Sequence, residues 1–478
     1  MEFDLNFRGK VLTIDSIGLL YVLVVGGLCH ILPIPEIIKG FLALPGLLII
    51  PYLVGKTVHL PIKKFLKIWP NNLDFFQNFI LCWCIGLVSM VVIAYFLNYF
   101  WLFDMQAYII FIVLLMCPAA IFHGEENESG DLKKCFEKYG GRVPISLAVL
   151  IGVMGFLFIS YFSPYPNIGG CDTAMHHYAT TLIVEENYFY FSGVYLSTLH
   201  LLMGSNLAVF NIHNDPFVLW WWTQLVFYVA YSFGLYLFSY QVSKDRLLSL
   251  IVPVIGLLTV HHFFAPIYLY DIAPKSIIII LFPYLLFFVH SRLLRERTLN
   301  EFLSRGADRL IFFVIICCVS LFLILYNTYN ASFRWSLVDA IGIILPAFII
   351  IVLFFTKYFF KDFESRKNLF LLVSLLFVLL SIHIAMGLLA FLFLIFYWAY
   401  SILVKRFSKR ARLSGYLICA FAVIFFSLQL MGVLHLSPIT LLYDRAGINM
   451  SSGLMDFNSI FGLITTMYPP IVILLFVI

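Results

Sequence analysis

The chain has 478 residues, of which 62% are hydrophobic and 12% are charged, and its formal net charge is +5. Soluble proteins average about 45–50% apolar and about 25% charged residues, so this composition excludes a soluble domain with one ordinary core. The 51 Phe and 27 Tyr suit helices that face lipid and aromatic belts at the membrane surfaces. We therefore expect an all-α polytopic integral membrane protein.

Apolar runs of span length, separated by short charged loops, predict about fourteen transmembrane helices. The first run lacks a small-residue cleavage site, so we expect it to be retained. The second contains Pro45 and Pro51 and is either a span or a re-entrant segment, and residues 369–404 are either two spans or one bent helix. The expected spans, in chain order, cover residues 16–34, 38–54, 76–98, 107–122, 143–163, 217–240, 247–265, 276–290, 310–326, 337–355, 369–381, 385–404, 413–434 and 459–478.

The basic residues divide between the two sides of this topology. Lys and Arg accumulate in cytoplasmic loops, and all but four of the 30 basic residues fall in alternate loops. We therefore expect a cytoplasmic N-terminus and an external active face, in the plasma membrane or, in a eukaryote, the endoplasmic reticulum. The four exceptions on the external side are Lys39, Lys275, Arg334 and Arg445.

Cysteine positions and missing nucleotide motifs narrow the function classes. Of the nine cysteines, only Cys171 lies clearly outside, so we expect no external disulfide framework within the chain. The sequence has no Walker loop and no GxGxxG, which argues against an ATPase. We expect no nucleic-acid partner, and the most polar stretch, residues 124–142, is predicted to be a cytoplasmic loop.

The longest external loop, residues 164–216, carries the first candidate chemistry. The pattern over residues 173–186 is helical, and Asp172 and His176 share one face because they are four residues apart. A second apolar stretch, residues 195–210, is too amphipathic and too close to be another span, so it is predicted to lie in the membrane interface. The loop is therefore expected to contain two interfacial helices.

Two interpretations stay open for each polar residue of this loop. Asp172 is either the N-cap of its helix or a catalytic carboxylate, and the two roles can coincide. His176 and His177 are either interfacial side chains with wet edges or ligands of a substrate or metal ion.

A second carboxylate lies in the next external loop, within the sequence Tyr-Leu-Tyr-Asp-Ile-Ala-Pro-Lys. Asp271 and Lys275 are four residues apart, so they form either a surface salt bridge or part of a phosphate site. Arg334 and Arg445 are further external cations. Basic groups on this side are what an anionic phosphate would require.

One acidic residue opens a loop of interfacial helices, and a second acidic residue follows in the loop two spans later. This arrangement resembles the GT-C fold of membrane glycosyltransferases. The likeness is to protein mannosyltransferases and lipid-A aminoarabinose transferases, covers roughly residues 143–355, and rests on CDTAMHHYATTLIVEENYF and YLYDIAPKS. It implies that Asp172 is a general base or positions the acceptor, and that Asp271 helps bind a metal ion or the donor phosphate. Residues 1–142 would be an N-terminal extension of about four spans, before a GT-C-like domain over residues 143–478.

Sugar transfer from a polyisoprenyl phosphate needs a carboxylate to take the acceptor proton and cations to stabilise the departing phosphate. We therefore expect a glycosyltransferase whose partners are a lipid-linked sugar donor and membrane lipid. A divalent metal ion held by Asp172, Asp271 and His176 would be its cofactor. The alternatives are a transporter or flippase of lipid-linked glycans and a non-catalytic subunit of a membrane complex. The expected spans carry almost no internal charge, which favours the enzyme over the transporter.

Overall fold

The computed structural model describes most of the first 291 residues of the chain. It covers residues 6–291 with gaps at 8–9, 12, 67–68, 70–72, 101, 123–127, 163–164, 166–170, 188–196, 261–271, 273 and 289, together with residues 378, 379 and 382. The last six expected spans, from residue 310 onward, therefore lie almost entirely outside the described residues.

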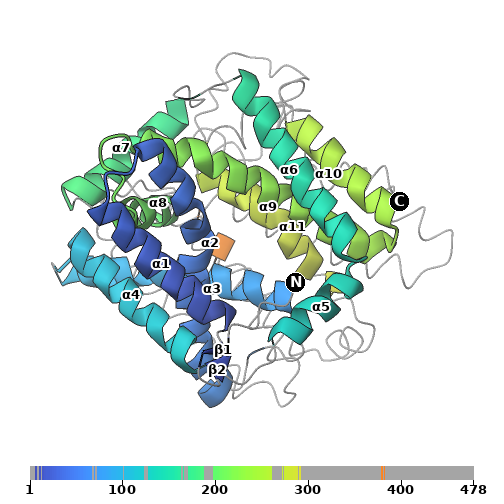
Figure 1. Cartoon of the computed structure of the whole chain (residues 1–478), viewed down its shortest axis with the longest axis horizontal. Helices are drawn as coiled ribbons and strands as arrows, with labels where there is room; N and C mark the ends of the chain where they lie inside the picture. The colour runs from blue at the N-terminus through green and yellow to red at the C-terminus, as the bar shows by residue number, and fades with distance from the viewer. Residues whose placement is uncertain are drawn as a thin grey trace, which may run out of the picture.

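The described part is helical apart from one pair of two-residue strands, β1 (Asn6–Phe7) and β2 (Lys10–Val11), which are antiparallel. Three helices and a π-helical turn lie outside the expected spans: α5 (Glu128–Lys138), α7 (Cys171–Glu185), α8 (Thr198–Val209) and Ile62–Leu66. Eight further helices coincide with the first eight expected spans (Figure 1): α1 (Ile14–Ile31), α2 (Glu36–Pro61), α3 (Phe75–Tyr99), α4 (Met105–Phe122), α6 (Arg142–Phe162), α9 (Phe217–Ser243), α10 (Arg246–Val260) and α11 (Pro274–Phe288).

The chain is a helical membrane protein by the length and composition of these helices. Four of the described helices, α1, α2, α3 and α9, are each long and apolar enough to cross a bilayer. The α5–α6 pair would add a fifth span if it is counted as one element. Helices α4, α8 and α11 are apolar but shorter. The predicted total of fourteen spans is not confirmed within the described part.

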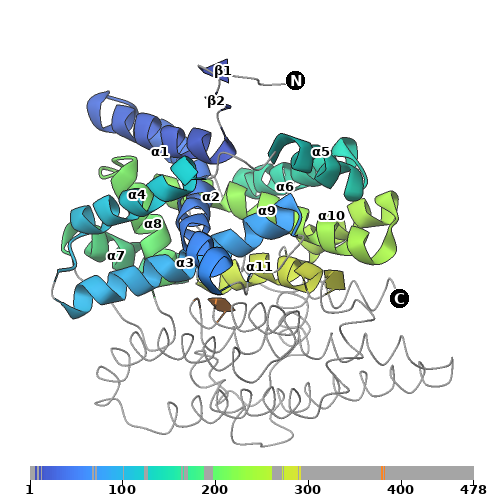
Figure 2. The same cartoon turned by 90° about the horizontal axis from the view of Figure 1, so that it is seen from below.

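Two long helices organise the packing. Helix α9 contacts α6, α10, α11 and α2, and α2 in turn contacts α1, α3 and α4 (Figure 1). In Figure 2, α1 and the two short strands lie on one side of this layer, and α11 lies on the other. Each of these helices therefore buries one side against α2 or α9.

Helix α2 is continuous through Pro45 and Pro51, so the alternative of a re-entrant segment for this run is wrong. Proline has no N–H, so Pro51 leaves the carbonyl of Leu47 without its helical donor. The indole N–H of Trp83 on α3 donates to that carbonyl oxygen at 3.1 Å. A neighbouring helix thus satisfies the backbone group that the proline frees, as an apolar environment requires.

Other side chains also reach carbonyls across helix pairs. Pro253 within α10 frees the carbonyl of Ser249, and the hydroxyl of Ser239 on α9 lies 3.3 Å from that oxygen, while its shorter contact, at 2.7 Å, is to the Leu235 carbonyl of its own helix. The hydroxyl of Tyr21 on α1 donates to the Leu42 carbonyl of α2 at 2.6 Å. These contacts tie α10 to α9 and α1 to α2.

Glycine brings the backbones of α2 and α3 into contact. A Cβ atom on Gly55 would lie 1.8 Å from the carbonyl oxygen of Cys82, and one on Gly86 would lie 1.7 Å from that of Pro51. No side chain fits at either position without separating the helices. Small residues that permit such close approach are a common means of helix association in membranes.

A buried ion pair joins α1 to α2. The ammonium group of Lys56 contacts the carboxylate of Asp15, and both side chains are almost fully enclosed, at 2% and 0% exposure. The prediction that Lys56 lies in a cytoplasmic loop is wrong, because Lys56 belongs to α2. The ion pair is also an exception to the expected near-absence of charge in the spans. Two opposite charges can be enclosed because each removes most of the other's desolvation cost, whereas either one alone would be strongly destabilising.

The expected cytoplasmic loop at residues 124–142 contains helix α5 instead. Gly140 and Gly141 have φ angles of +92° and +102°, which glycine adopts without strain, and they turn the chain between α5 and α6. The two helices meet at 84°. We call this junction the elbow. Sequence analysis missed α5 because its composition is polar and its buried positions are few.

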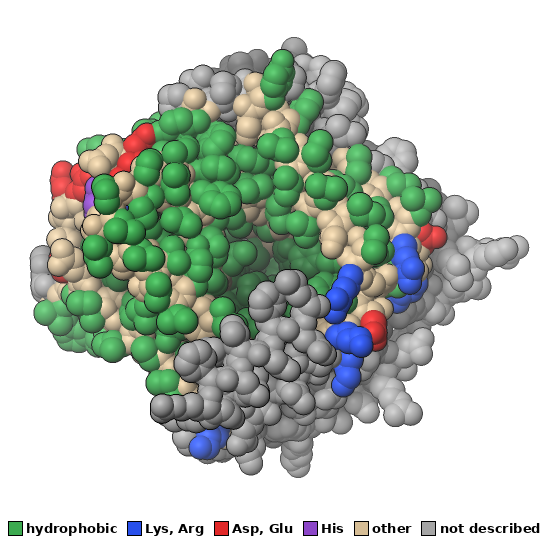
Figure 3. Space-filling model, viewed as in Figure 1, with side chains coloured by type: hydrophobic (Ala, Val, Ile, Leu, Met, Phe, Trp, Pro, Cys, Tyr) green, Lys and Arg blue, Asp and Glu red, His purple; other side chains and the backbone are tan. Residues whose placement is uncertain are grey.

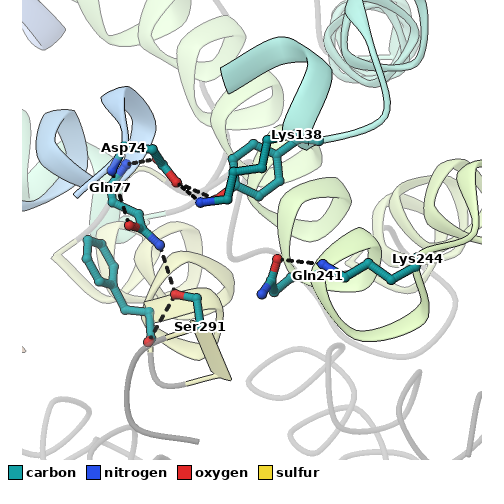
Figure 4. A network of polar contacts seen from close by, with 8 residues as sticks. Asp74, Gln77, Lys138, Gln241, Lys244 and Ser291 are labelled. Carbon is teal, nitrogen blue, oxygen red and sulfur yellow. Dashed lines mark hydrogen bonds and ion pairs between the residues drawn. The ribbon is translucent and has the colours of Figure 1, made fainter. Parts of the chain in front are cut away.

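The carboxylate of Asp74 anchors the elbow (Figure 4). Asp74 caps α3 by accepting from the backbone N–H of Gln77 at 3.0 Å, and it also accepts from Lys138 and the hydroxyl of Tyr139, both at 2.6 Å. The amide of Gln77 reaches Ser291 beyond α11 at 2.9 Å. Asp74 therefore links α3 to the end of α5, and its capping partner Gln77 links α3 to the segment that follows α11.

Most Lys and Arg side chains on the face drawn in Figure 3 lie on the side of α5, with some acidic groups among them. The side of α7 carries acidic groups, and hydrophobic side chains cover much of the surface between the two sides. We call the side of α5 the basic end of the bundle and the side of α7 the opposite end. This arrangement agrees with the charge asymmetry read from the sequence.

Replacing Trp83 with Phe should destabilise the protein by about 1–3 kcal/mol, because the Leu47 carbonyl would remain buried without a donor. Trp222→Phe is the matched control. Its indole donates to the Ile37 carbonyl at 3.0 Å, at a point where α2 contains no proline and supplies its own donor. Thermal unfolding in detergent should show a clearly smaller loss for Trp222→Phe, and equal losses would contradict the role given to Pro51.

Cysteine labelling tests which end faces the cytoplasm. Cys135 is buried, so an impermeant thiol reagent would miss it on either side of the membrane. The exposed positions Lys134 and Glu186 are better sites. In intact cells the reagent should label Glu186→Cys above the background of the parent protein, while Lys134→Cys should react only after permeabilisation. The reverse pattern would overturn the predicted orientation.

Candidate functional site

The predicted site residues are only partly within the described structure. Asp172 is the second residue of α7, and Lys275 is the second residue of α11, each described by its backbone alone. Asp271, Arg334 and Arg445 lie outside the described residues, and so does the distance between Asp172 and Asp271. The side chains of His176 and His177 are described, and the site can be built from them.

Helix α7 begins at Cys171, which puts Asp172 in its first turn rather than at the N-cap. A carboxylate in the first turn is still stabilised by the helix dipole. One turn later, His176 and Thr180 are buried, with Thr173 beside them, so this face of α7 points into the protein. The prediction of a helix starting near Asp172 is confirmed.

His176 pairs with a second histidine that the sequence analysis did not single out. Its Nδ1 lies 3.0 Å from Nε2 of His200 on α8, so one ring donates an N–H and the other accepts it. His200 is 1% exposed. Burial lowers the pKa of His200 to about 3, and the neighbouring His176 adds to the effect. The His200 ring is therefore neutral at physiological pH.

His177 points to a different neighbour. Its ring stacks on Phe217 at the start of α9, with centroids 3.7 Å apart, and lies 6.2 Å from the Trp220 ring. Burial lowers the pKa of His177 to about 4. The two adjacent histidines thus connect α7 to α8 and to α9, and His177 is partly enclosed rather than lying at a wet edge.

Helix α8 is enclosed by protein instead of lying amphipathically in the interface. All of residues 198–207 are buried, and α8 contacts α2, α3, α4, α7 and α9. The prediction of an interfacial helix with one exposed face is therefore wrong for α8. Its polar side chains misled the sequence analysis, because in the fold they face other helices rather than water.

Helices α8 and α9 carry further buried polar side chains near the pair formed by His176 and His200. Several bond to a carbonyl one turn earlier on their own helix: Ser205 to Leu201 at 2.5 Å, Asn206 to Leu202 at 2.8 Å and Thr223 to Leu219 at 2.7 Å. Within the described part, the Asn206 Oδ1 and Trp220 Nε1 atoms are buried and have no hydrogen-bond partner. These are an acceptor and a donor suited to a ligand's hydroxyl groups.

The beginning of α11 lies at the same end of the bundle. Tyr284 donates to the Ala230 carbonyl at 2.5 Å, and Phe287 stacks near Tyr139, which Tyr236 contacts through its hydroxyl. Later residues of α11 thus meet later residues of α9, so the two helices run parallel. Lys275 is nine residues before Tyr284, which lies opposite Ala230 and Gly234, so the first turn of α11 is level with about residues 221–225 of α9, one to two turns beyond Phe217.

Lys39 closes this end of the bundle. Its ammonium group donates to Glu36 at 3.0 Å and to the backbone carbonyl of Asn211 just after α8 at 2.8 Å. The nearby carboxyl of Asp215 accepts from the hydroxyl of Tyr165, and burial followed by the charge of Glu36 raises its pKa. Lys39, one of the four cations placed outside by the sequence, therefore holds α2 against the end of α8.

The cluster can donate and accept hydrogen bonds with neutral groups, and Asp172 precedes His176 by one turn of α7. Within the described residues, no three His, Cys, Asp or Glu side chains gather as metal ligands would. Comparisons with protein-family models, with curated proteins and with solved structures found no match for this chain.

His200→Gln should make the protein less sensitive to acid. A histidine whose pKa is lower in the folded state takes up a proton on unfolding. Its contribution to the free energy of unfolding therefore falls as the pH drops from about 6.5 toward about 3, and the loss is about 2 kcal/mol at pH 5. The difference in melting temperature between pH 7.5 and pH 5 should therefore shrink in this variant.

The exposed His213 in the following loop supplies the control for this measurement. His213→Gln should leave the acid sensitivity of the melting temperature as it is in the parent protein. An equal change in the two variants would mean that His200 is protonated as readily as a surface histidine.

Proposed function

We propose that this chain is a membrane glycosyltransferase that moves a sugar from a polyisoprenyl-phosphate-linked donor to an acceptor on the external face. The observation that carries the proposal is the enclosed polar cluster around His176 and His200, which starts one turn after Asp172 at the end of the bundle away from the basic residues. In the proposal the carboxyl group of Asp172 is the general base, and its place in the sequence one turn before His176 supports that role.

In the proposed reaction, Asp172 takes the proton of the acceptor hydroxyl as that oxygen forms its bond to the anomeric carbon. The bond from the anomeric carbon to the donor phosphate breaks, and the polyisoprenyl phosphate leaves. His176 and His177 contribute neutral hydrogen-bonding groups to the sugar. Lys275, Arg334 and Arg445 are assigned to the leaving phosphate, because cations stabilise the negative charge that develops there.

The placement of Lys275 supports this assignment. Since α9 and α11 run parallel, the first turn of α11 lies beside the first half of α9, one to two turns beyond the contact of His177 with Phe217. The proposed base and one proposed phosphate-binding cation are thus carried by elements at the same end of the bundle. A chain this apolar also suits a donor whose carrier is a long hydrocarbon.

If a divalent metal ion takes part, Asp172, Asp271 and His176 are its proposed ligands. Such an ion would supply charge stabilisation for the donor phosphate. His176 already contacts His200 through Nδ1, and the described residues form no group of three such ligands. The roles given to Asp172, His176 and Lys275 above therefore stand without a metal-dependent step.

A transporter or flippase of lipid-linked glycans is the second candidate, and one observation favours it. Asp15 and Lys56 form an enclosed ion pair between two spans, and ionisable groups within membrane helices often belong to a transport pathway. Asp15 lies in the first turn of α1 and Lys56 lies near the end of α2, away from the histidine cluster. A transport role would therefore involve residues separate from the histidine cluster.

Asp172→Asn tests the enzyme directly. The substitution keeps the size and polarity of the side chain but removes the base, so transfer of a radiolabelled sugar from a polyprenyl-phosphate donor should fall by about 10²–10⁴-fold. The assay uses the full chain in proteoliposomes, with expression and melting temperature measured in parallel.

Asp104→Asn is the matched control, because Asp104 is likewise an aspartate at the start of a helix, where its carboxylate accepts from the backbone N–H of Ala107 at 2.9 Å. That variant should keep its transfer activity. Full activity of Asp172→Asn would remove the catalytic assignment. Loss of glycolipid translocation in Lys56→Met, without any sugar transfer by the parent protein, would favour the transporter.

A further inference from the structure

We propose that the basic end of the bundle holds an anionic phospholipid in the surface between α6 and α10. Its phosphate would lie against Arg142, Lys244 and Arg246, which we call the elbow cations, and its acyl chains would follow the exposed apolar faces of the two helices. This site is separate from the histidine cluster and does not depend on the proposed transferase activity.

The fold brings the elbow cations together from two distant parts of the chain. Both α6 and α10 run antiparallel to α9: Ser232 donates to the Ala148 carbonyl at 2.6 Å, and Ser239 donates to that of Ser249 at 3.3 Å. Helices α6 and α10 therefore run parallel, and Gly155 on α6 faces Leu257 on α10. Arg142 is the first residue of α6 and Arg246 is the first residue of α10, and Lys244 is the C-cap of α9 two residues before α10, so the three lie at the same end of these helices.

The elbow cations have no carboxylate partner in the part of the chain that the structure describes. Lys244 donates to the neutral amide of Gln241 at 2.9 Å, and Arg142 lies over the Phe136 ring at 6.0 Å. The two nearby carboxylates serve as helix caps. Asp74 caps α3 and binds Lys138, and Asp245 accepts from the backbone N–H of Leu248 at 2.9 Å.

A further lysine, Lys138, lies near Lys244; Figure 4 shows Lys138 pointing to Asp74 and Lys244 pointing to Gln241. The pKa of Lys244 is lowered by burial first and by the neighbouring Lys138 second. The backbone of Lys244 also adopts a left-handed conformation with a φ of 59°, an unusual state for a lysine. Glu137, the exposed acid of α5, makes no ion pair with the elbow cations. A bound phosphate would offset the mutual repulsion of the cations.

Apolar side chains next to the cations favour a lipid over a free anion. Val143 follows Arg142 directly, Leu247 follows Arg246 directly, and each is 70% exposed. Further exposed apolar residues continue along the same two helices: Leu147, Leu150, Ile251 and Val254. Positive charge at one end of an exposed apolar strip matches the chemistry of a phospholipid with a charged headgroup and two hydrocarbon chains.

The elbow also sets α5 at the right angle for a membrane surface. Helix α5 meets α6 at 84°, so when α6 crosses the bilayer, α5 lies along its surface. Leu132, Cys135 and Phe136 face the protein, while Lys133 and Lys134 are exposed. The elbow cations are therefore placed at the depth of lipid headgroups.

The experiment titrates phosphatidylglycerol into the purified full-length chain in a neutral detergent and follows binding by native mass spectrometry. Wild type should bind the lipid saturably and prefer it to phosphatidylcholine. Each cation near a lipid surface contributes about fivefold in affinity, so the double variant R142Q/R246Q should bind about 25-fold more weakly.

The double variant K133Q/K134Q removes the same charge from the exposed side of α5 and should bind within a few-fold of wild type. Melting temperatures without added lipid check that each variant is folded. Equal loss in both double variants would overturn the site, because it would indicate a diffuse charge effect. Equal binding of phosphatidylcholine would also overturn it, and so would competition by glycerol phosphate at the concentration that saturates the lipid.

Discussion

The structure depends on one constraint: inside a membrane, each backbone N–H and C=O must find its partner within the protein. Pro51 of α2 makes the constraint visible, because it frees the carbonyl of Leu47 within the helix. The Trp83 indole supplies the missing donor from the neighbouring helix α3. Because water cannot substitute for this donor, the position of the proline is coupled to the choice of packing partner.

Charged groups obey the same constraint more strictly, since they are far harder to desolvate. Within the described part they are either paired inside the bundle, as Asp15 and Lys56 are, or kept at its two ends. At the basic end, Asp74 combines helix capping with an ion pair and leaves the elbow cations without a carboxylate partner. At the opposite end, Lys39 is used to close α2 onto α8. The two ends therefore have different electrostatic characters and suit different ligands.

The histidine cluster takes its chemical character from enclosure. His200 would be an ordinary titratable residue at a surface, but burial holds its pKa near 3 and keeps its ring neutral. A neutral histidine can both donate and accept a hydrogen bond, which suits a sugar hydroxyl better than a positive charge would. The proposed donor would carry its negative charge on phosphate, so cations such as Lys275 are needed nearby but outside the neutral cluster.

The sequence by itself determined the membrane class, the helices at the first eight expected spans and the separation of basic residues between the two ends. Apolar runs and loop cations are local signals that do not depend on packing, so these predictions followed from composition and spacing. The shared face of Asp172 and His176 on α7 was also readable from their four-residue spacing, but the inward direction of that face was not.

Only the tertiary structure decided which polar residues share an environment. His200 lies in a stretch that reads as amphipathic, and nothing in its spacing from His176 indicates that the two rings are 3.0 Å apart. Lys56 looked like a loop cation until α1 supplied Asp15, and α8 looked interfacial until the surrounding helices enclosed it. The elbow cations, too, come together only because α6 and α10 both run antiparallel to α9. Each of these outcomes depends on contacts between residues far apart in the chain, and a sequence pattern records the polarity of a residue but not the partner that satisfies it.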